Sequence, residues 1–401
     1  MYKHILHNFQ LLLTACYYSF FRRDKNLWVF GEWFGCRCCD NAMYFANYVC
    51  RNHPEITLKW ICKPSTDTSG LDAMVERVEM DTRESKWLLK HAGFLFVVQN
   101  FGDLTGRKFS YYFTNAKVVN FWHGVPWKRI GGDRYSSKWI MLYRRIWVRK
   151  FETQIYLASS DKFADILHRA FNCSYNNIIR AGYPRNSLFF DANEIDKYRR
   201  KLLITLKDIS FETDSSVKII TYMPTFRDNT SKVFSFESIK QNEELCKILE
   251  SYNAIIIEKG HHVSTGRLHT LTHKSASRVL HIKDYNTQEL LAATDILITD
   301  YSSCFFDYLL LNRPIIHYLY DYNYYMNNDR GLYYSKEEVA CGDCPSTLNE
   351  LLLSIQANLV NPMKDESLRM RQKKEFIKNE GANSCEVIFS NIVRLRGFRN
   401  E

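Results

Sequence analysis

One short segment, residues 120–133, combines histidine, lysine and arginine with glycine and proline: Asn-Phe-Trp-His-Gly-Val-Pro-Trp-Lys-Arg-Ile-Gly-Gly-Asp. The unperturbed pKa of a histidine side chain is about 6.5, so His123 can accept a proton from an attacking hydroxyl at neutral pH. Gly124 lets the backbone approach a ligand, and Lys128 adds positive charge. The segment is our candidate catalytic loop, and a structural histidine bonded to a nearby carbonyl is the alternative.

A second segment, residues 295–307, joins an apolar strand to a helix start that is rich in hydroxyl groups. Thr299 and Asp300 end the expected strand, and Ser302 and Ser303 fall at the start of a helix that runs towards residue 311. Unpaired backbone N–H groups and the positive end of the helix dipole favour phosphate there. The alternative is an ordinary helix cap.

Three further strand ends carry groups that suit phosphate. Thr225 and Arg227 follow one expected strand, and an arginine can hold a phosphate with two parallel hydrogen bonds. Lys259 and His261 follow the next strand, and Arg330 follows the last. Adjacent histidines diverge and no acidic residue or cysteine lies at ligand spacing, so we favour phosphate contact over metal. For Arg227, a surface loop with an Arg–Asp pair is the alternative.

Composition limits the class of protein. A chain of 401 residues has room for two α/β domains, each with its own core. The net charge is +10, and the chain contains 25 Tyr and 26 Phe. A basic, aromatic surface suits an acidic partner such as nucleic acid, an anionic membrane or a phosphate-rich substrate. We expect no nucleic-acid partner, because the basic residues are not concentrated in a recognisable module.

The 12 cysteines are scattered along the chain. The one dense group, Cys36, Cys38 and Cys39, has no second cluster at zinc-ligand spacing. Cys341 and Cys344 form a single C-x-x-C pair without a following helical pattern. We therefore expect reduced thiols in a cytoplasmic protein and no metal site.

Short apolar runs alternate with helical patterns, which predicts an α/β fold with parallel sheets. The expected strands are 28–30, 58–62, 94–98, 118–122 and 155–158 in the first half, and 218–223, 254–258, 279–282, 296–299 and 315–318 in the second. Both halves place a histidine just after a buried strand. The carboxyl ends of parallel strands face the ligand crevice, so two facing domains bring the histidines towards one cleft.

We expect four regions along the chain: an N-terminal amphipathic segment at 1–26, α/β domains at 27–192 and 217–401, and a linker at 193–216. The linker is charged and helix-prone, and it has no strand signal. The apolar part of the N-terminal segment, residues 5–21, is too short and too polar for a comfortable transmembrane helix. It suits an interfacial helix, with a helix packed on the protein's own core as the alternative.

Five motifs in the same order resemble the series found in the CDP-glycerol glycerophosphotransferase family, whose members build glycerol- or ribitol-phosphate polymers such as wall teichoic acids. They are Trp122-His123-Gly124-x-Pro126-x-Lys128, Met223-Pro224-Thr225-x-Arg227-Asp228, Lys259-x-His261, Thr299-Asp300-Tyr301-Ser302-Ser303 with Asp307, and Pro314-Ile315-Ile316-x-Tyr318-x-x-Asp321 with Arg330-Gly331. Asp40-Asn41 before an aromatic helix resembles the start of the family, so the resemblance covers residues 27–335.

The resemblance implies a GT-B-like fold of two facing Rossmann-like domains, with 27–192 on the acceptor side and 217–401, including the C-terminal helices, binding the CDP donor. It implies that His123 is the general base and that His261 is a second essential histidine near the diphosphate. The implied donor and phosphate contacts are Thr225, Arg227, Lys259, Thr299, Asp300, Ser302, Ser303 and Arg330. The implied acceptor or loop residues are Gly124, Lys128 and Asp40.

We therefore expect an enzyme that transfers a polyol phosphate, most readily glycerol phosphate, from CDP-glycerol or CDP-ribitol to an acceptor hydroxyl. CMP leaves, no cofactor is expected, and the product is a teichoic acid or capsule-type polymer. The acceptor is expected to be lipid-linked or polymeric, at the inner face of the cell membrane. Two alternatives stay open: a GT-B glycosyltransferase that uses a nucleotide sugar, and a non-catalytic peripheral protein that binds an anionic polymer.

Three departures from the family's pattern mark this chain. Val125 and Trp127 stand where the family often has threonine and leucine, and His262 replaces the proline that commonly follows the second histidine. Cys36 to Cys39 are the third departure. The first and third bear on acceptor recognition, so the polyol can differ. The second can alter the orientation of the preceding histidine.

Overall fold

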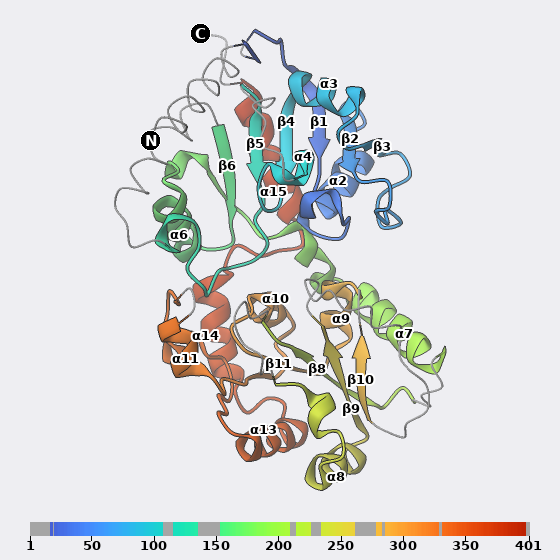
Figure 1. Ribbon diagram of the computed structural model, residues 1–401, viewed down its shortest axis with the longest axis vertical. Coiled ribbons are helices and arrows are strands. Elements are labelled where there is room, and N and C mark those ends of the chain that lie inside the picture. Colours follow the sequence, from blue (N-terminus) through green and yellow to red (C-terminus); the bar gives the residue numbers. More distant parts are fainter. Residues whose placement is uncertain are drawn as a thin grey trace. The chain divides into compact units, whose positions relative to one another are not determined.

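The computed structural model describes residues 17–18, 20–106, 115–134, 153–208, 214–225, 234–260, 278–282, 285–328 and 331–397. Contacts within the chain divide it into two compact units (Figure 1). The first unit comprises Met1–His123, Ile130–Ser187 and Lys378–Glu401, and the second comprises Gly124–Arg129 and Leu188–Ile377. The six residues directly after His123 therefore belong to the second unit, although the chain on both sides of them belongs to the first.

A seven-stranded parallel sheet forms the first unit, in the order β3-β2-β1-β4-β5-β6-β7. Its strands are β1 (Asp24–Phe30), β2 (Thr57–Cys62), β3 (Glu76–Glu79), β4 (Ala92–Val97), β5 (Lys117–Asn120), β6 (Thr153–Ala158) and β7 (Ile178–Arg180). The strand order reverses direction between β1 and β4. In open α/β sheets ligands bind beyond the carboxyl ends of the strands at such a reversal.

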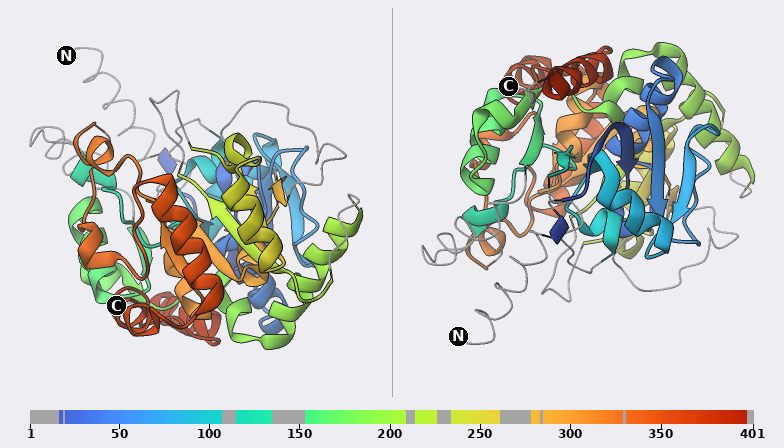
Figure 2. Two further views of the ribbon diagram at one scale, coloured as in Figure 1. Left: turned by 90° about the horizontal axis from the view of Figure 1, so that it is seen from below. Right: turned by 90° about the horizontal axis from the view of Figure 1, so that it is seen from above.

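Alternation along β1 explains why helices cover both faces of this sheet. Leu27 and Val29 share a buried cluster with Leu88 of α3 (Arg83–His91). The ring of Trp28 packs on Phe45 of α2 (Asn41–Asn52), on the opposite face. Two-sided burial of this kind gives the near-continuous apolar strands that the sequence shows. The two faces can be followed in Figure 2.

The first unit has two further long helices, α6 (Asp161–Phe171) and α15 (Ser384–Gly397), and several short helical elements. The short elements are α4 (Gly102–Thr105) and the 3₁₀ turns η1 (Trp33–Gly35), η2 (Gly131–Arg134) and η4 (Tyr175–Asn177), while η5 (Pro184–Phe190) runs across the unit boundary. The side chain of Asp40 caps α2 and that of Ser160 caps α6, each by accepting from a backbone N–H.

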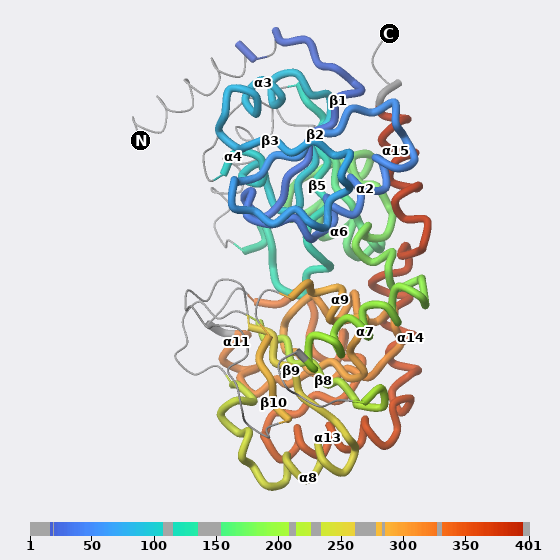
Figure 3. The backbone as a smooth tube through the Cα atoms, turned by 90° about the vertical axis from the view of Figure 1, so that its right-hand side faces the viewer, coloured from blue at the N-terminus to red at the C-terminus, as the bar shows by residue number. Residues whose placement is uncertain are grey.

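The C-terminal helix α15 lies alongside α2, although the two are far apart in the sequence (Figure 3). Its Phe389 ring lies 5.6 Å from the ring of Trp28 and 3.4 Å from that of His53. These aromatic contacts place residues 378–401 with the first unit. The grouping differs from the expected boundary, which assigned the whole of 217–401 to the second domain.

A five-stranded parallel sheet forms the second unit, in the order β10-β9-β8-β11-β12. Its strands are β8 (Lys218–Met223), β9 (Ala254–Lys259), β10 (Val279–Ile282), β11 (Ile296–Thr299) and β12 (Ile315–His317). The order reverses between β8 and β11, so the ends of these two strands flank the expected ligand crevice of this sheet.

Helices complete the second unit: α7 (Ala192–Asp208), α8 (Glu243–Ser251), α9 (Thr287–Ala293), α10 (Cys304–Tyr308), α11 (Tyr322–Asn328), α12 (Lys336–Val339), α13 (Leu348–Val360) and α14 (Glu366–Phe376), with 3₁₀ turns η6 (Phe236–Ile239) and η7 (Leu309–Leu311). Leu245 of α8 and Leu351 of α13 join Ile220 of β8 in one buried cluster. Most of the expected linker is therefore helix α7.

The predicted α/β class with parallel sheets is confirmed in both units. Two edge strands, β3 and β7, were not predicted. β3 reads Glu-Arg-Val-Glu and buries one side chain, and β7 has three residues, so neither carries the apolar run of a central strand. Among the described residues, no helix combines the length and apolar character that a membrane crossing requires.

Candidate active site

The loop after β5 carries His123 in an uncommon backbone conformation. Trp122 has φ +58° and Gly124 has φ +129°, the first rarely adopted by a residue as bulky as tryptophan. The backbone N–H of Trp122 donates to Asn120 Oδ1 at 2.9 Å, which turns the chain as the strand ends. His123 is partly exposed, although Nδ1 of its ring is buried. The backbone strain lies at Trp122, directly before the histidine, and the catalytic role of His123 stays a prediction.

Two long-range side chains hold this loop by its backbone carbonyls. Asn41 Nδ2 donates to the carbonyl of Trp122 at 3.0 Å, and Arg185 Nη2 donates to the carbonyl of His123 at 3.2 Å. Asn41 and Arg185 are also bonded to each other, because the Arg185 backbone N–H donates to Asn41 Oδ1 at 3.2 Å. The histidine loop therefore rests on α2 and on the segment after β7.

Asp40 completes this support from a buried position. Its Oδ1 accepts from Arg185 Nη1 at 2.8 Å and from the backbone N–H of Asn41 at 2.8 Å. Its Oδ2 accepts from Trp33 Nε1 at 3.1 Å. The carboxylate and the guanidinium are both about nine-tenths buried, so each depends on the other for charge compensation. These contacts give Asp40 a supporting place behind the histidine loop.

Two more buried carboxyl groups lie in the segments that follow β1 and β4. Glu32 Oε1 accepts from the backbone N–H groups of Cys39 and Asp40, and burial, with the nearby Asp40 charge, raises the pKa of Glu32 well above its usual range. Asp103 accepts from the backbone N–H groups of Phe34, Val98 and Gln99, yet burial raises its pKa to about 6. Neither carboxyl group was predicted, because no spacing relates it to the histidine.

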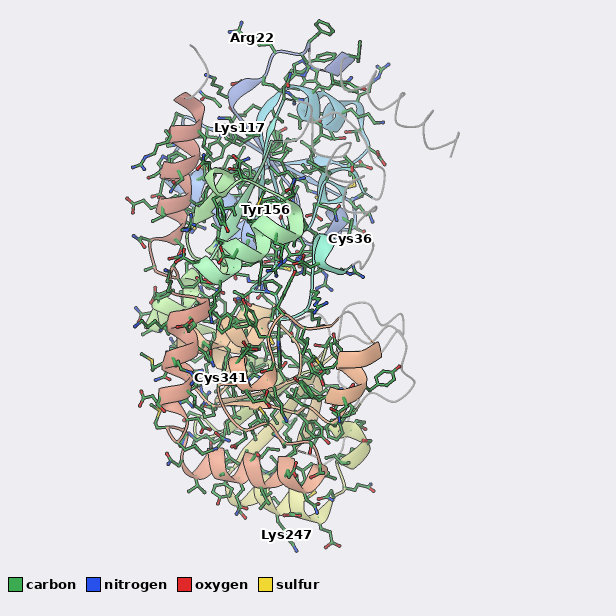
Figure 4. The ribbon with its side chains drawn as sticks, turned by 90° about the vertical axis from the view of Figure 1, so that its left-hand side faces the viewer. Arg22, Cys36, Lys117, Tyr156, Lys247 and Cys341 are labelled. Atoms are coloured by element: carbon green, nitrogen blue, oxygen red, sulfur yellow. The ribbon has the colours of Figure 1, made fainter. Side chains whose placement is uncertain are left out.

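The cysteines of the first loop lie close to this support. Cys36, labelled in Figure 4, is exposed, and its Sγ lies 3.0 Å from Lys63 Nζ. Cys38 is buried, and burial raises the pKa of its thiol. Among the described residues, no group of three or more histidine, cysteine or acidic side chains is arranged to hold a metal ion.

In the second unit, Asp300 joins the ends of β8 and β11. Its Oδ1 accepts from the backbone N–H of Thr225 at 2.8 Å and from that of Tyr301 at 2.6 Å. Thr299 Oγ1 donates to the carbonyl of Met223 at 2.7 Å. These bonds tie the two strand ends at the reversal of strand order, where a ligand is expected.

Ser302 and Ser303 follow directly and begin a short helix. Ser303 is the N-terminal cap residue of α10, but its side chain caps no backbone N–H. Ser302 Oγ accepts from the backbone N–H of Cys304 at 3.5 Å, which is a long hydrogen bond. The sequence predicted one helix that runs towards residue 311. The structure has the five-residue helix α10, followed from Leu309 by the 3₁₀ turn η7.

Lys259 ends β9, next to β8, and is almost fully buried. Its Nζ donates to Thr287 Oγ1, at the start of α9. Lys128, on the segment after the histidine loop, places its Nζ 5.7 Å from the centre of the Tyr325 ring. Three predicted phosphate ligands, Arg227, His261 and Arg330, lie outside the described residues, so their roles stay predictions.

Two α/β units with polar groups at the carboxyl ends of their strands define the class of nucleotide-binding-type α/β proteins. The family model for CDP-glycerol:poly(glycerophosphate) glycerophosphotransferases matches residues 15–394. The chain belongs to this family.

Curated relatives agree with this membership. A teichoic acid poly(glycerol phosphate) polymerase of Bacillus spizizenii is 28% identical over 288 residues, which cover 68% of this chain and 69% of the relative. A teichoic acid glycerol-phosphate transferase of Staphylococcus aureus is 30% identical over 231 residues, covering 54% of this chain and 56% of the relative. The matched region covers 42% of the length of a poly(glycerol phosphate) polymerase of Staphylococcus epidermidis.

Solved structures confirm the GT-B-like fold. A variant of the wall teichoic acid polymerase TagF has a TM-score of 0.76 at 20% identity, covering 100% of this chain and 98% of the solved TagF chain. The UDP-GlcNAc 2-epimerase of Neisseria meningitidis, solved with UDP-GlcNAc bound, has a TM-score of 0.55 at 12% identity, covering 92% and 100%. At these identities the likeness concerns the fold alone.

Proposed function

We propose that this protein transfers glycerol phosphate from CDP-glycerol to a hydroxyl group of a teichoic-acid-type acceptor, with release of CMP. The observation that carries the proposal is the family match over residues 15–394. The curated relatives include glycerol-phosphate transferases and polymerases. The site geometry supports it, because a partly exposed histidine and a strand-end turn suited to phosphate both lie where parallel sheets bind ligands.

In the proposed reaction the acceptor oxygen attacks the β-phosphorus of the donor, and the bond to the CMP oxygen breaks. His123 takes the proton of the attacking hydroxyl, and CMP leaves as an anion. Positioning and positive charge then account for most of the catalysis, because negative charge spreads over the phosphoryl oxygens. Lys259, His261, Arg227 and Arg330 are the proposed sources of that charge. Thr225, Thr299, Asp300 and the turn at Ser302–Ser303 shape the proposed diphosphate site.

The test is the His123→Ala variant, measured by release of CMP from CDP-glycerol with a lipid-linked glycerol-phosphate acceptor. A positioned base contributes about 10²–10⁴-fold, so turnover should fall by that factor while binding of CDP-glycerol is kept. His168→Ala is the control, because His168 is exposed on α6, where its ring stacks on that of Tyr175. Unchanged turnover in His123→Ala would remove the general-base role.

The donor polyol is the finer part of the proposal. The relatives include a ribitol-phosphate polymerase of Staphylococcus aureus, 25% identical over 241 residues, so CDP-ribitol is assayed beside CDP-glycerol. We propose glycerol, because the relatives with the higher identities are glycerol-phosphate enzymes. Release of UDP or GDP from a nucleotide sugar, with no CMP from either CDP-polyol, would favour the glycosyltransferase alternative. Retention of polymer without any nucleotide product would favour a binding protein.

We further propose that the enzyme works at an anionic membrane surface, where a lipid-linked acceptor lies. Tyr17, Phe20 and Trp87 are more than half exposed, and Lys90 lies over the rings of Tyr18 and Phe21. Exposed aromatic rings beside cationic groups suit the headgroup region of a bilayer. Joint replacement of Phe20 and Trp87 by alanine should weaken co-sedimentation with phosphatidylglycerol vesicles severalfold, and replacement of the exposed Tyr175, after α6, should not. Equal co-sedimentation of all three proteins would contradict the proposal.

A further inference from the structure

The segment directly after His123 is bound to the second unit by its backbone. The Arg129 N–H donates to the carbonyl of Gly331 at 3.1 Å, and the Tyr333 N–H donates to the carbonyl of Trp127 at 2.8 Å. Between them Lys128 and Leu332 form an antiparallel bridge. Residues 127–129 and 331–333 therefore pair as two short antiparallel strands.

Trp127 anchors this pairing with its side chain. The indole is 1% exposed, and its Nε1 donates to the carbonyl of Tyr334 at 2.8 Å. Its ring lies 5.6 Å from the ring of Tyr301, 5.8 Å from that of Phe305 and 6.1 Å from that of His317. A buried aromatic residue with a satisfied N–H is a strong and directional anchor.

The groups around Trp127 belong to the proposed donor site. Tyr301 stands between Asp300 and Ser302 in the turn after β11, and Phe305 lies in the helix that this turn begins. Gly331 directly follows Arg330, the proposed phosphate clamp. The segment that leaves His123 is thus attached to both stretches of chain that are proposed to hold the donor phosphates.

From this attachment we infer that Trp127 is a positioning residue, which fixes the backbone after the base to the donor turn and so sets the place of the His123 imidazole. The inference rests on the proposed function, because it needs His123 to be the base. Only three residues lie between the anchor and the base, so movement of one is passed to the other through a short stretch of chain. A misplacement of about 1 Å can cost about 100-fold in rate.

The first test compares three variants, Trp127→Phe, Trp127→Leu and Trp127→Ala. Phenylalanine keeps an aromatic ring but lacks the N–H that bonds to Tyr334. Leucine and alanine lose the ring contacts as well. We expect kcat to fall about threefold for phenylalanine and about 10- to 100-fold for leucine and alanine. The KM for CDP-glycerol should stay within about twofold of that of the unmodified protein, because Trp127 does not itself bind the donor.

Trp28→Phe and Trp28→Leu are matched controls. Trp28 is likewise fully buried, and its Nε1 donates to the carbonyl of Lys25 at 3.0 Å in the first unit. These variants should lower the melting temperature about as much as the Trp127 variants do, without the loss in kcat. An equal loss of kcat in both series would show that Trp127 acts only through general stability, and it would overturn the inference.

The second test combines Trp127→Leu with His123→Ala. If Trp127 acts through the base, its replacement should not reduce further the residual turnover that remains without the base. A further 10-fold loss in the double variant would show an independent effect and overturn the inference. Failure of the proposed function is seen separately, because His123→Ala alone would then leave turnover unchanged.

Discussion

The loop after β5 and the turn after β11 both end a parallel strand, but different forces hold them. The loop is held by side chains far away in the sequence, since Asn41 lies 81 residues from Trp122 and Arg185 lies 62 residues from His123. The turn is held mainly by Asp300, which accepts from backbone N–H groups at the ends of two adjacent strands.

This difference concerns charge. Behind the loop, Asp40 and Arg185 form a buried ion pair, with Glu32 and Asp103 nearby as further buried carboxyl groups. Behind the turn, the packed groups are largely aromatic, and His317 is a buried imidazole among them. The loop is therefore supported by a buried ion pair, whereas the proposed phosphate turn is supported by hydrogen bonds to the Asp300 side chain and by ring packing.

The largest expected effect is the loss of the ion pair. Arg185→Ala leaves the Asp40 carboxylate buried without its partner, which costs about 3–5 kcal/mol in the free energy of unfolding. Urea unfolding measures this loss. It should also reduce turnover in the molecules that stay folded, because the carbonyl of His123 loses the guanidinium that holds it.

Two controls separate these contributions. Arg180→Ala breaks a pair with Asp161 whose side chains are about half exposed, so it should cost less than about 1 kcal/mol. Arg185→Lys keeps a positive charge near Asp40 but lacks the planar fork, so it should regain stability more fully than turnover. A loss as small as that of Arg180→Ala in the Arg185→Ala variant would refute the electrostatic account of the loop.

The contrast also explains how much the sequence could predict. The central strands were predicted because each is a short apolar run, as in Ile296-Leu297-Ile298. The turn at Asp300–Ser303 was predicted because strand, turn and helix start are consecutive in the chain. Edge strand β3 was not predicted, because only one of its four side chains is buried and the strand has no apolar run.

The support of the histidine loop could not be predicted in the same way. The Arg185–Asp40 pair joins residues 145 positions apart, and the Trp127–Tyr334 bond joins residues 207 positions apart. Nothing in the local spacing of an arginine or a tryptophan indicates a partner at that distance. Such contacts depend on the order of the strands in the sheet, and a single sequence does not give that order.

The second prediction concerns pH, where the two regions should respond in opposite directions. The folded pKa of Asp103 is about 6, above its ordinary value of 3.8, so the folded state holds the extra proton and stability falls as pH rises through this range. Burial lowers the pKa of His317 from 6.5 to about 4, so the unfolded state holds the extra proton and stability falls as pH drops through that range. Each shift corresponds to about 3 kcal/mol.

Glu32→Gln and His317→Gln test this opposition. The raised pKa of Glu32 gives it the same sign as Asp103, and glutamine keeps an oxygen for the N–H groups of Cys39 and Asp40. Relative to the unmodified protein, Glu32→Gln should gain stability as pH rises above about 4.5. His317→Gln should gain relative stability as pH falls below about 6.5. Urea unfolding at several pH values between 4 and 8 measures both, and parallel slopes would contradict the assignment.

The smallest expected effect on stability belongs to Ser302 in the turn after β11. Its hydroxyl accepts one backbone N–H at 3.5 Å, so Ser302→Ala should change the free energy of unfolding by less than about 0.5 kcal/mol. Thr82→Ala is a suitable comparison, because Thr82 caps α3 at 3.1 Å and its loss should cost about 1 kcal/mol. Calorimetry gives the two stabilities, and CMP release gives the KM for CDP-glycerol. A hydroxyl that contributes little to the fold but contacts the donor should raise KM when it is removed. If KM stays constant in Ser302→Ala, this hydroxyl has no part in donor binding, and the phosphate site then depends on the backbone of the turn.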